Sequence, residues 1–123
     1  MDSLSSKRLP KCERLCGENN ISTLLKRGKF INEENLKACY LTNPSLDISR
    51  IMVSVPKKLF KRAVKRNLLK RRIRESYRQQ KDKLRGSNID ILFIYPQKVE
   101  LSYETIFQSV GNLLETIASK HNG

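Results

Sequence analysis

The chain has 123 residues, and 25 lysines and arginines against 12 acids give it a formal charge of +13. A chain of this length forms one domain with a modest core, and a hydrophobic content of 38% excludes a disordered polyelectrolyte. No apolar segment approaches the roughly 18 residues of a membrane helix. Three cysteines and one histidine provide neither a disulfide framework nor a zinc site. We therefore expect a cytoplasmic domain over residues 1–123, with about 1–8 and 119–123 flexible, that binds a polyanion and neither a membrane nor a small-molecule substrate.

The first predicted element is a short helix at residues 19–27. Ile21, Leu24 and Leu25 recur at helical spacing, and Gly28 is placed to end the helix in a left-handed conformation.

The remaining elements alternate between strands and two further helices. Apolar patterning predicts strands at residues 30–31, 36–41, 48–55 and 89–95. A long basic helix is predicted at 57–84, although its first residues could also form a loop after Pro56. The last helix begins after Ser102, which offers a side-chain N-cap.

This order of elements indicates an α/β (α+β) two-layer sandwich. We expect a four-stranded mixed sheet with three helices, in which the strands at 48–55 and 89–95 lie parallel on either side of the basic helix. General sterics favour a right-handed crossover in about 98% of such units.

Nearly all of the excess charge lies in one segment. Residues 57–85 contain 14 basic residues and two acids, whereas the other 94 residues contain 11 basic and 10 acidic ones. Like charges at three- and four-residue spacing destabilise a helix, and the first acid after Lys57 is Glu75. We therefore expect an external anion to neutralise this helix.

The predicted helix also has an apolar side. On a helical wheel six of its residues share a sector of about 120°, the width of a stripe that faces a core: Leu59, Ala63, Leu69, Ile73, Tyr77 and Leu84. Arg62, Arg66 and Lys70 fall in the same sector, so either they border the packing face or the first half of the helix turns another side inward.

The polyanion is predicted to be a nucleic acid that is bound through its phosphates. Arginine favours bidentate phosphate contacts. Asn67 could read a base or sugar edge or be merely solvated, and Tyr40 could be a stacking platform or a core residue. The chain shows no histidine pair and no carboxylate cluster in the basic region, so a protein-only nuclease is disfavoured.

The basic segment resembles the protein subunit of bacterial ribonuclease P. The match covers Ser54-Val55-Pro56-Lys57-Lys58 and the stretch from Ala63 to Glu75, AVKRNLLKRRIRE, with weaker support from residues 9–15 and 101–104. The family usually has a small residue at Pro56, a basic residue at Leu68 and, in some members, aromatic residues at Ile21 and Leu25.

The resemblance implies a left-handed crossover and a subunit that assists a catalytic RNA. That RNA, with Mg²⁺ bound mainly by the RNA, would cut the leader from precursor tRNA, and the protein would bind both RNAs. The residues that the resemblance implies to contact the catalytic RNA lie in or beside the motif: Lys57, Lys58, Lys61, Arg62, Arg66, Asn67, Lys70, Arg71 and Arg74. Those expected in a leader-binding cleft are Tyr40, Met52, Ser54, Ile21 and Leu25. The alternative is a ribosomal or other basic RNA-binding protein without a role in tRNA processing.

Overall fold

The computed structural model describes residues 18–42, 49–84 and 88–122 of the chain. The elements in chain order are α2 (Glu18–Arg27), β1 (Lys29–Asn32), β2 (Lys37–Thr42), β3 (Arg50–Ser54), α3 (Ala63–Gln80), the 3₁₀ turn η2 (Lys81–Leu84), β4 (Ile89–Ile94) and α4 (Tyr103–Asn122). The predicted flexible residues 1–8 and the family-like stretch 9–15 lie outside the described residues, whereas α4 continues through most of 119–123.

The four strands form one mixed sheet in the order β1-β2-β4-β3. The β1–β2 and β2–β4 pairs are antiparallel, and β3 runs parallel to β4 with Ile51 opposite Ile91. The predicted mixed sheet with three helices is therefore confirmed. Helix α3 connects the two parallel strands, and the left hand of this crossover stays a prediction from the resemblance.

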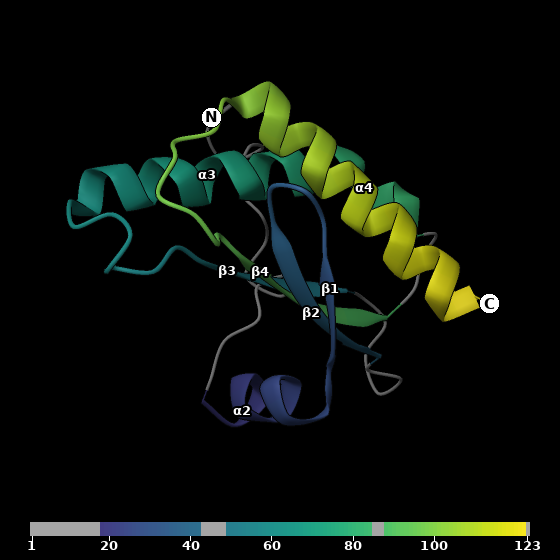
Figure 1. Ribbon diagram of the computed structural model, residues 1–123. Helices are drawn as coiled ribbons and strands as arrows, with labels where there is room; N and C mark the ends of the chain where they lie inside the picture. Colours follow the sequence, from purple (N-terminus) through teal and green to yellow (C-terminus); the bar gives the residue numbers. More distant parts are fainter. Residues whose placement is uncertain (1–17, 43–48, 85–87, 123) are drawn as a thin grey trace, which may run out of the picture.

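Helices cover both faces of the sheet (Figure 1). Helices α3 and α4 lie together on one face, and α2 lies on the other. The main core is on the α3–α4 face, where Ile51, Phe93 and Tyr95 of the sheet segment meet Ile73 and Tyr77 of α3. A smaller cluster of Leu24, Cys39 and Leu92 lies under α2. Because strand side chains alternate, each central strand contributes to both clusters.

Helix α3 is shorter than the predicted helix at 57–84. The carbonyl of Pro56 accepts hydrogen bonds from the amides of Leu59 and Phe60, at 3.0 and 3.3 Å, so the chain turns before the helix. Arg62 is extended (φ −82°, ψ 128°) and the helix begins at Ala63. Ala63 is therefore exposed and Leu59 only half-buried, which corrects the first part of the apolar stripe.

The rest of the stripe is confirmed. Leu69, Ile73, Tyr77 and Leu84 are buried, and the Tyr77 ring packs against Phe93 with centroids 6.2 Å apart. Ser102 also acts as predicted, because its Oγ accepts a hydrogen bond from the Thr105 amide at 3.2 Å at the start of α4.

Gly28 is required for space and not for a left-handed conformation. Its φ lies outside the left-handed region, but a Cβ there would stand 2.4 Å from the Leu24 carbonyl oxygen and 2.6 Å from the Cys39 Sγ. Its amide donates to the same Leu24 oxygen at 2.7 Å, so the chain leaves α2 tightly against β2.

We expect Ile73→Ala to lower the free energy of unfolding by about 2–5 kcal/mol, the usual cost of truncating a fully buried aliphatic side chain. Ile73 has no exposed surface and lies between α3 and the sheet. Urea unfolding followed by circular dichroism measures the change. Val64, on the same helix but 81% exposed, provides the control variant Val64→Ala, which should change the value by less than about 0.5 kcal/mol. Equal effects of the two substitutions would contradict this packing.

We expect Gly28→Ala to destabilise the fold by about 1–3 kcal/mol, because backbone and a buried sulfur must move to admit the methyl group. Gly111→Ala is the matched control. Its Cβ would stand 2.4 Å from the Oε1 of Gln80, the end of a side chain that can shift although its Nε2 donates to the Phe107 carbonyl. The preference for alanine over glycine within a helix, about 1 kcal/mol, offsets the cost of that shift. Thermal melts should show a clear loss for the first variant and a change within about 1 kcal/mol for the second. A similar loss for both would mean that Gly28 is not specially constrained.

Candidate nucleic-acid interface

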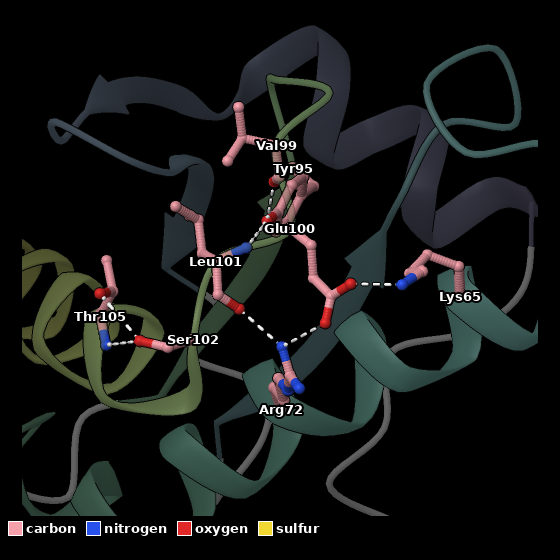
Figure 2. A network of polar contacts seen from close by, with 8 residues as sticks. All are labelled: Lys65, Arg72, Tyr95, Val99, Glu100, Leu101, Ser102 and Thr105. Atoms are coloured by element: carbon pink, nitrogen blue, oxygen red, sulfur yellow. Dashed lines mark hydrogen bonds and ion pairs between the residues drawn. The ribbon is translucent and has the colours of Figure 1, made fainter.

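The burial of one side of α3 leaves its basic residues on two other parts of the helix surface. One is the outer side, and the other is a flank that faces the segment between β4 and α4. At about 100° per residue, the inward side is defined by Leu69, Ile73 and Tyr77. The side chains of Asn67, Arg71 and Arg74 are exposed on the outer side, and Lys70 is half-buried at its margin. Lys65 and Arg72 lie on the other flank, which faces the segment between β4 and α4 (Figure 2).

Glu100 neutralises the two cations on the flank of α3 that faces the β4–α4 segment. Lys65 and Arg72 both form ion pairs with Glu100, the latter at 3.3 Å, as Figure 2 shows. The ion pair with Lys65 lowers the pKa of Glu100, with a further contribution from Arg72, so the carboxylate is charged at neutral pH. The repulsion within the helix is therefore partly relieved by a residue that is distant in sequence.

Further along the same helix, Arg78 pairs with Glu75, and Lys83 of the following turn pairs with Glu115 of α4 at 2.7 Å. These pairs are partly exposed and individually weak. They nevertheless leave fewer uncompensated charges at the carboxyl end of α3 than at its amino end.

A second set of side chains, six basic ones and the amide of Asn67, has no such partners. Among the residues that the structure describes, the following side chains form no ion pair or hydrogen bond: Lys57, Lys58, Lys61, Arg62, Asn67, Lys70 and Arg71. Apart from Lys70 they are all exposed, and they follow one another from the turn before α3 onto its outer side. We call these seven residues together with Arg74 the cationic surface. An array of uncompensated cations on a rigid element attracts phosphate strongly.

Arg66 holds the two parts of this surface together. Its Nη1 donates hydrogen bonds to the carbonyl oxygens of Phe60 and Lys61, at 2.9 and 2.8 Å. The Phe60 ring in turn packs edge-on against Tyr95, with centroids 5.6 Å apart. Arg66, expected from the motif to meet RNA, thus also fixes the turn that carries Lys57, Lys58 and Lys61.

The residues predicted to form a leader-binding cleft do not all lie on the same face of the sheet. Met52 and Ser54 are half-buried on the α2 face of the sheet, and Leu25 is exposed on α2. Ile21 also belongs to α2. Tyr40 is 5% exposed and lies in the main core on the opposite face, so its predicted place beside Met52 and Ser54 is wrong.

Two features of the surface were not predicted. Phe30 is 49% exposed, and the Lys37 Nζ lies 5.1 Å from its ring centroid. Both are on the α2 face, because Phe30 pairs with Cys39 across β1 and β2. The sequence did contain a signal: Phe30 and Ile31 are neighbours in a short edge strand, so their side chains point to opposite faces and only one of them enters the main core. The contact of Glu100 with α3 had no local signal, because it joins residues 28 and 35 positions apart.

Comparison with known proteins identifies the family. The family model described as Ribonuclease P matches residues 9–118. The chain belongs to the ribonuclease P protein family.

Curated relatives and solved structures agree with this membership. The ribonuclease P protein component of Borrelia turicatae is 38% identical over 95 residues, which are 76% of this chain and 82% of the relative. The Staphylococcus aureus RNase P protein has a TM-score of 0.77 at 27% identity, covering 87% of this chain and 96% of that one. The Thermotoga maritima RNase P protein has a TM-score of 0.74 at 28% identity, covering 85% and 96%.

The side chains of the cationic surface are suited to contacts with phosphate oxygens. Within residues 18–42, 49–84 and 88–122, no group of three or more His, Cys, Asp or Glu side chains could hold a metal ion. The carboxylate of Asp90 is buried in a bidentate pair with Arg50, at 2.9 and 2.8 Å, away from α3. A search of the described helices found none that could cross a membrane. The charge and exposure of the cationic surface indicate phosphate recognition.

We expect Lys70→Ala and Arg71→Ala each to remove one phosphate contact. The slope of log K against log salt concentration should become shallower by about 0.7–0.9 per variant, and the free energy of unfolding should stay within about 0.5 kcal/mol. Filter binding to ribonuclease P RNA at several salt concentrations measures the slope. Lys98→Ala removes an exposed lysine outside the surface and serves as the charge-matched control. An unchanged slope for both test variants would remove α3 from the interface.

Proposed function

We propose that the chain acts as the RNA-binding subunit of ribonuclease P and assists the removal of the 5′ leader from precursor tRNA. The observation that carries the proposal is the cationic surface, where Lys57, Lys58, Lys61, Arg62, Lys70 and Arg71 form no ion pair among the described residues of a chain of this family. A component of ribonuclease P implies the ribonuclease P RNA as its partner. The matches named above give no support to the alternative of a ribosomal protein.

The proposed contact with the catalytic RNA runs along the cationic surface. Lys57, Lys58, Lys61 and Arg62 precede the helix, and Asn67, Lys70, Arg71 and Arg74 continue along it. Because the Arg66 hydrogen bonds and the burial of α3 hold both parts, the cations are positioned before RNA arrives. Such preorganisation lowers the entropic cost of binding.

The proposed leader contact lies on the α2 face and not on α3. Met52 and Ser54 offer a half-buried apolar and a hydroxyl group, with Leu25 exposed on α2. Ile21 remains a candidate because it is on the same helix. The core position of Tyr40 removes it from this set.

The proposed roles in catalysis are divided between protein and RNA. We place the Mg²⁺ ions mainly with the RNA, as the resemblance to the ribonuclease P protein family implies. The protein would favour their binding indirectly by neutralising phosphates and holding the substrate. We also propose a cytoplasmic location, which fits the buried free thiol of Cys39 because such thiols persist in reducing compartments.

Reconstitution with the cognate catalytic RNA tests the proposal. At a low Mg²⁺ concentration, where the RNA alone cleaves slowly, the protein should accelerate cleavage of precursor tRNA and lower its KM. The same RNA with a Lys70→Ala/Arg71→Ala double variant should need a higher protein concentration, whereas Lys98→Ala should behave like the parent.

No stimulation by the parent protein would overturn the proposal. Cleavage of precursor tRNA by the protein without RNA would instead contradict the division of roles. A leaderless tRNA provides the substrate control, since the protein should not improve its binding to the assembled enzyme.

A further inference from the structure

The segment between β4 and α4 places one carboxylate against α3. Tyr95 is fully buried, and its hydroxyl donates to the Val99 carbonyl at 2.5 Å and accepts from the Leu101 amide at 2.8 Å. The Leu101 carbonyl accepts a further hydrogen bond from Arg72 at 2.7 Å. Main-chain contacts on both sides of Glu100 therefore fix its position without help from its own carboxylate (Figure 2).

The carboxylate of Glu100 is directed at two cations of the helix. One oxygen contacts the Lys65 Nζ and the other lies 3.3 Å from the Arg72 Nη1. Arg72 has a second partner in the Leu101 carbonyl, whereas Glu100 is the only ion-pair or hydrogen-bond partner of the Lys65 side chain among the described residues. Lys65 is thus the cation whose availability depends most on Glu100.

We propose that Glu100 sets the boundary of the RNA-binding surface by withholding Lys65 from phosphate, so that RNA is confined to the outer side of α3. The inference rests on the proposed function only in assigning RNA as the ligand. The Lys65 side chain is 42% exposed, so burial does not keep it from phosphate. The ion pair does, because the Tyr95 hydrogen bonds hold the segment that carries Glu100 in place. A phosphate that approaches this flank also meets the negative charge of Glu100, which adds repulsion to the loss of the lysine.

The variant Glu100→Gln tests this boundary. It removes the charge while the Tyr95 and Leu101 contacts remain, so Lys65 should become available as one additional phosphate contact. For an unrelated RNA duplex, the slope of log K against log salt concentration should steepen by about 0.7–0.9. The control is Glu104→Gln, which changes the net charge equally but releases no cation, because Glu104 has no ion pair with any described residue. It should leave the slope unchanged.

A double-variant cycle assigns the effect to Lys65. Lys65→Ala should leave the slope unchanged in the parent protein, and in the Glu100→Gln background it should cancel the added contact. If Lys65→Ala makes the parent slope shallower as Lys70→Ala does, or if Glu100→Gln lowers the melting temperature without steepening the slope, the inference is overturned. In the second case Glu100 contributes only to the stability of the fold.

The same titrations with the cognate catalytic RNA separate this inference from the proposed function. Preference of the parent protein for the cognate RNA over the duplex should decrease in Glu100→Gln, because the added contact requires no particular RNA shape. If the parent shows no such preference, the proposed function fails while the duplex measurement still decides the role of Glu100. If the preference exists and is unaffected by Glu100→Gln, the boundary is overturned and the function stands.

Discussion

The packing of Leu69, Ile73 and Tyr77 against the sheet determines where every charge on α3 points. A helix turns about 100° per residue, so fixing these three side chains in the core also fixes the directions of their neighbours. Asn67 and Arg71 are turned outward, while Lys65 and Arg72 are turned toward Glu100. A core contact, and not a contact with RNA, therefore organises the surface that RNA would meet.

The distribution of acids completes this arrangement. Repulsion within α3 is relieved on one flank by Glu100 and near its end by Glu75. Among the described residues, the lysines of the turn before the helix and Lys70 and Arg71 on α3 have no such relief. Arg66 joins the turn to the helix through the carbonyls of Phe60 and Lys61. Uncompensated charge reduces the stability of the free protein and increases its attraction to phosphate. The same imbalance thus links a cost in folding to the binding of RNA.

The sequence predicted what depends on local pattern. The charged segment, the buried part of the α3 stripe and the cap at Ser102 follow from neighbours within a few residues, and the structure confirms them. The start of α3 was predicted too early because lysine and arginine favour helix even where Pro56 begins a turn.

Side-chain direction in β2 was harder to predict. Its sequence, Ala38-Cys39-Tyr40-Leu41, is apolar at every position because helices cover both faces of the sheet, so alternation gave no sign that Tyr40 points to the main core and Cys39 to α2. Gly28 shows a related limit, since it lies between α2 and β1 while its close neighbour Cys39 belongs to β2. The partners of Glu100 are likewise set by the tertiary fold alone.

The division of α3 into a neutralised flank and a phosphate-binding side is the central claim. Lysine acylation, quantified by mass spectrometry with and without ribonuclease P RNA, tests it directly. RNA should protect Lys57, Lys58, Lys61 and Lys70, while the reactivities of Lys65 and of the distant Lys120 should not change. Protection of Lys65 equal to that of Lys70, or protection of neither, would contradict the claim.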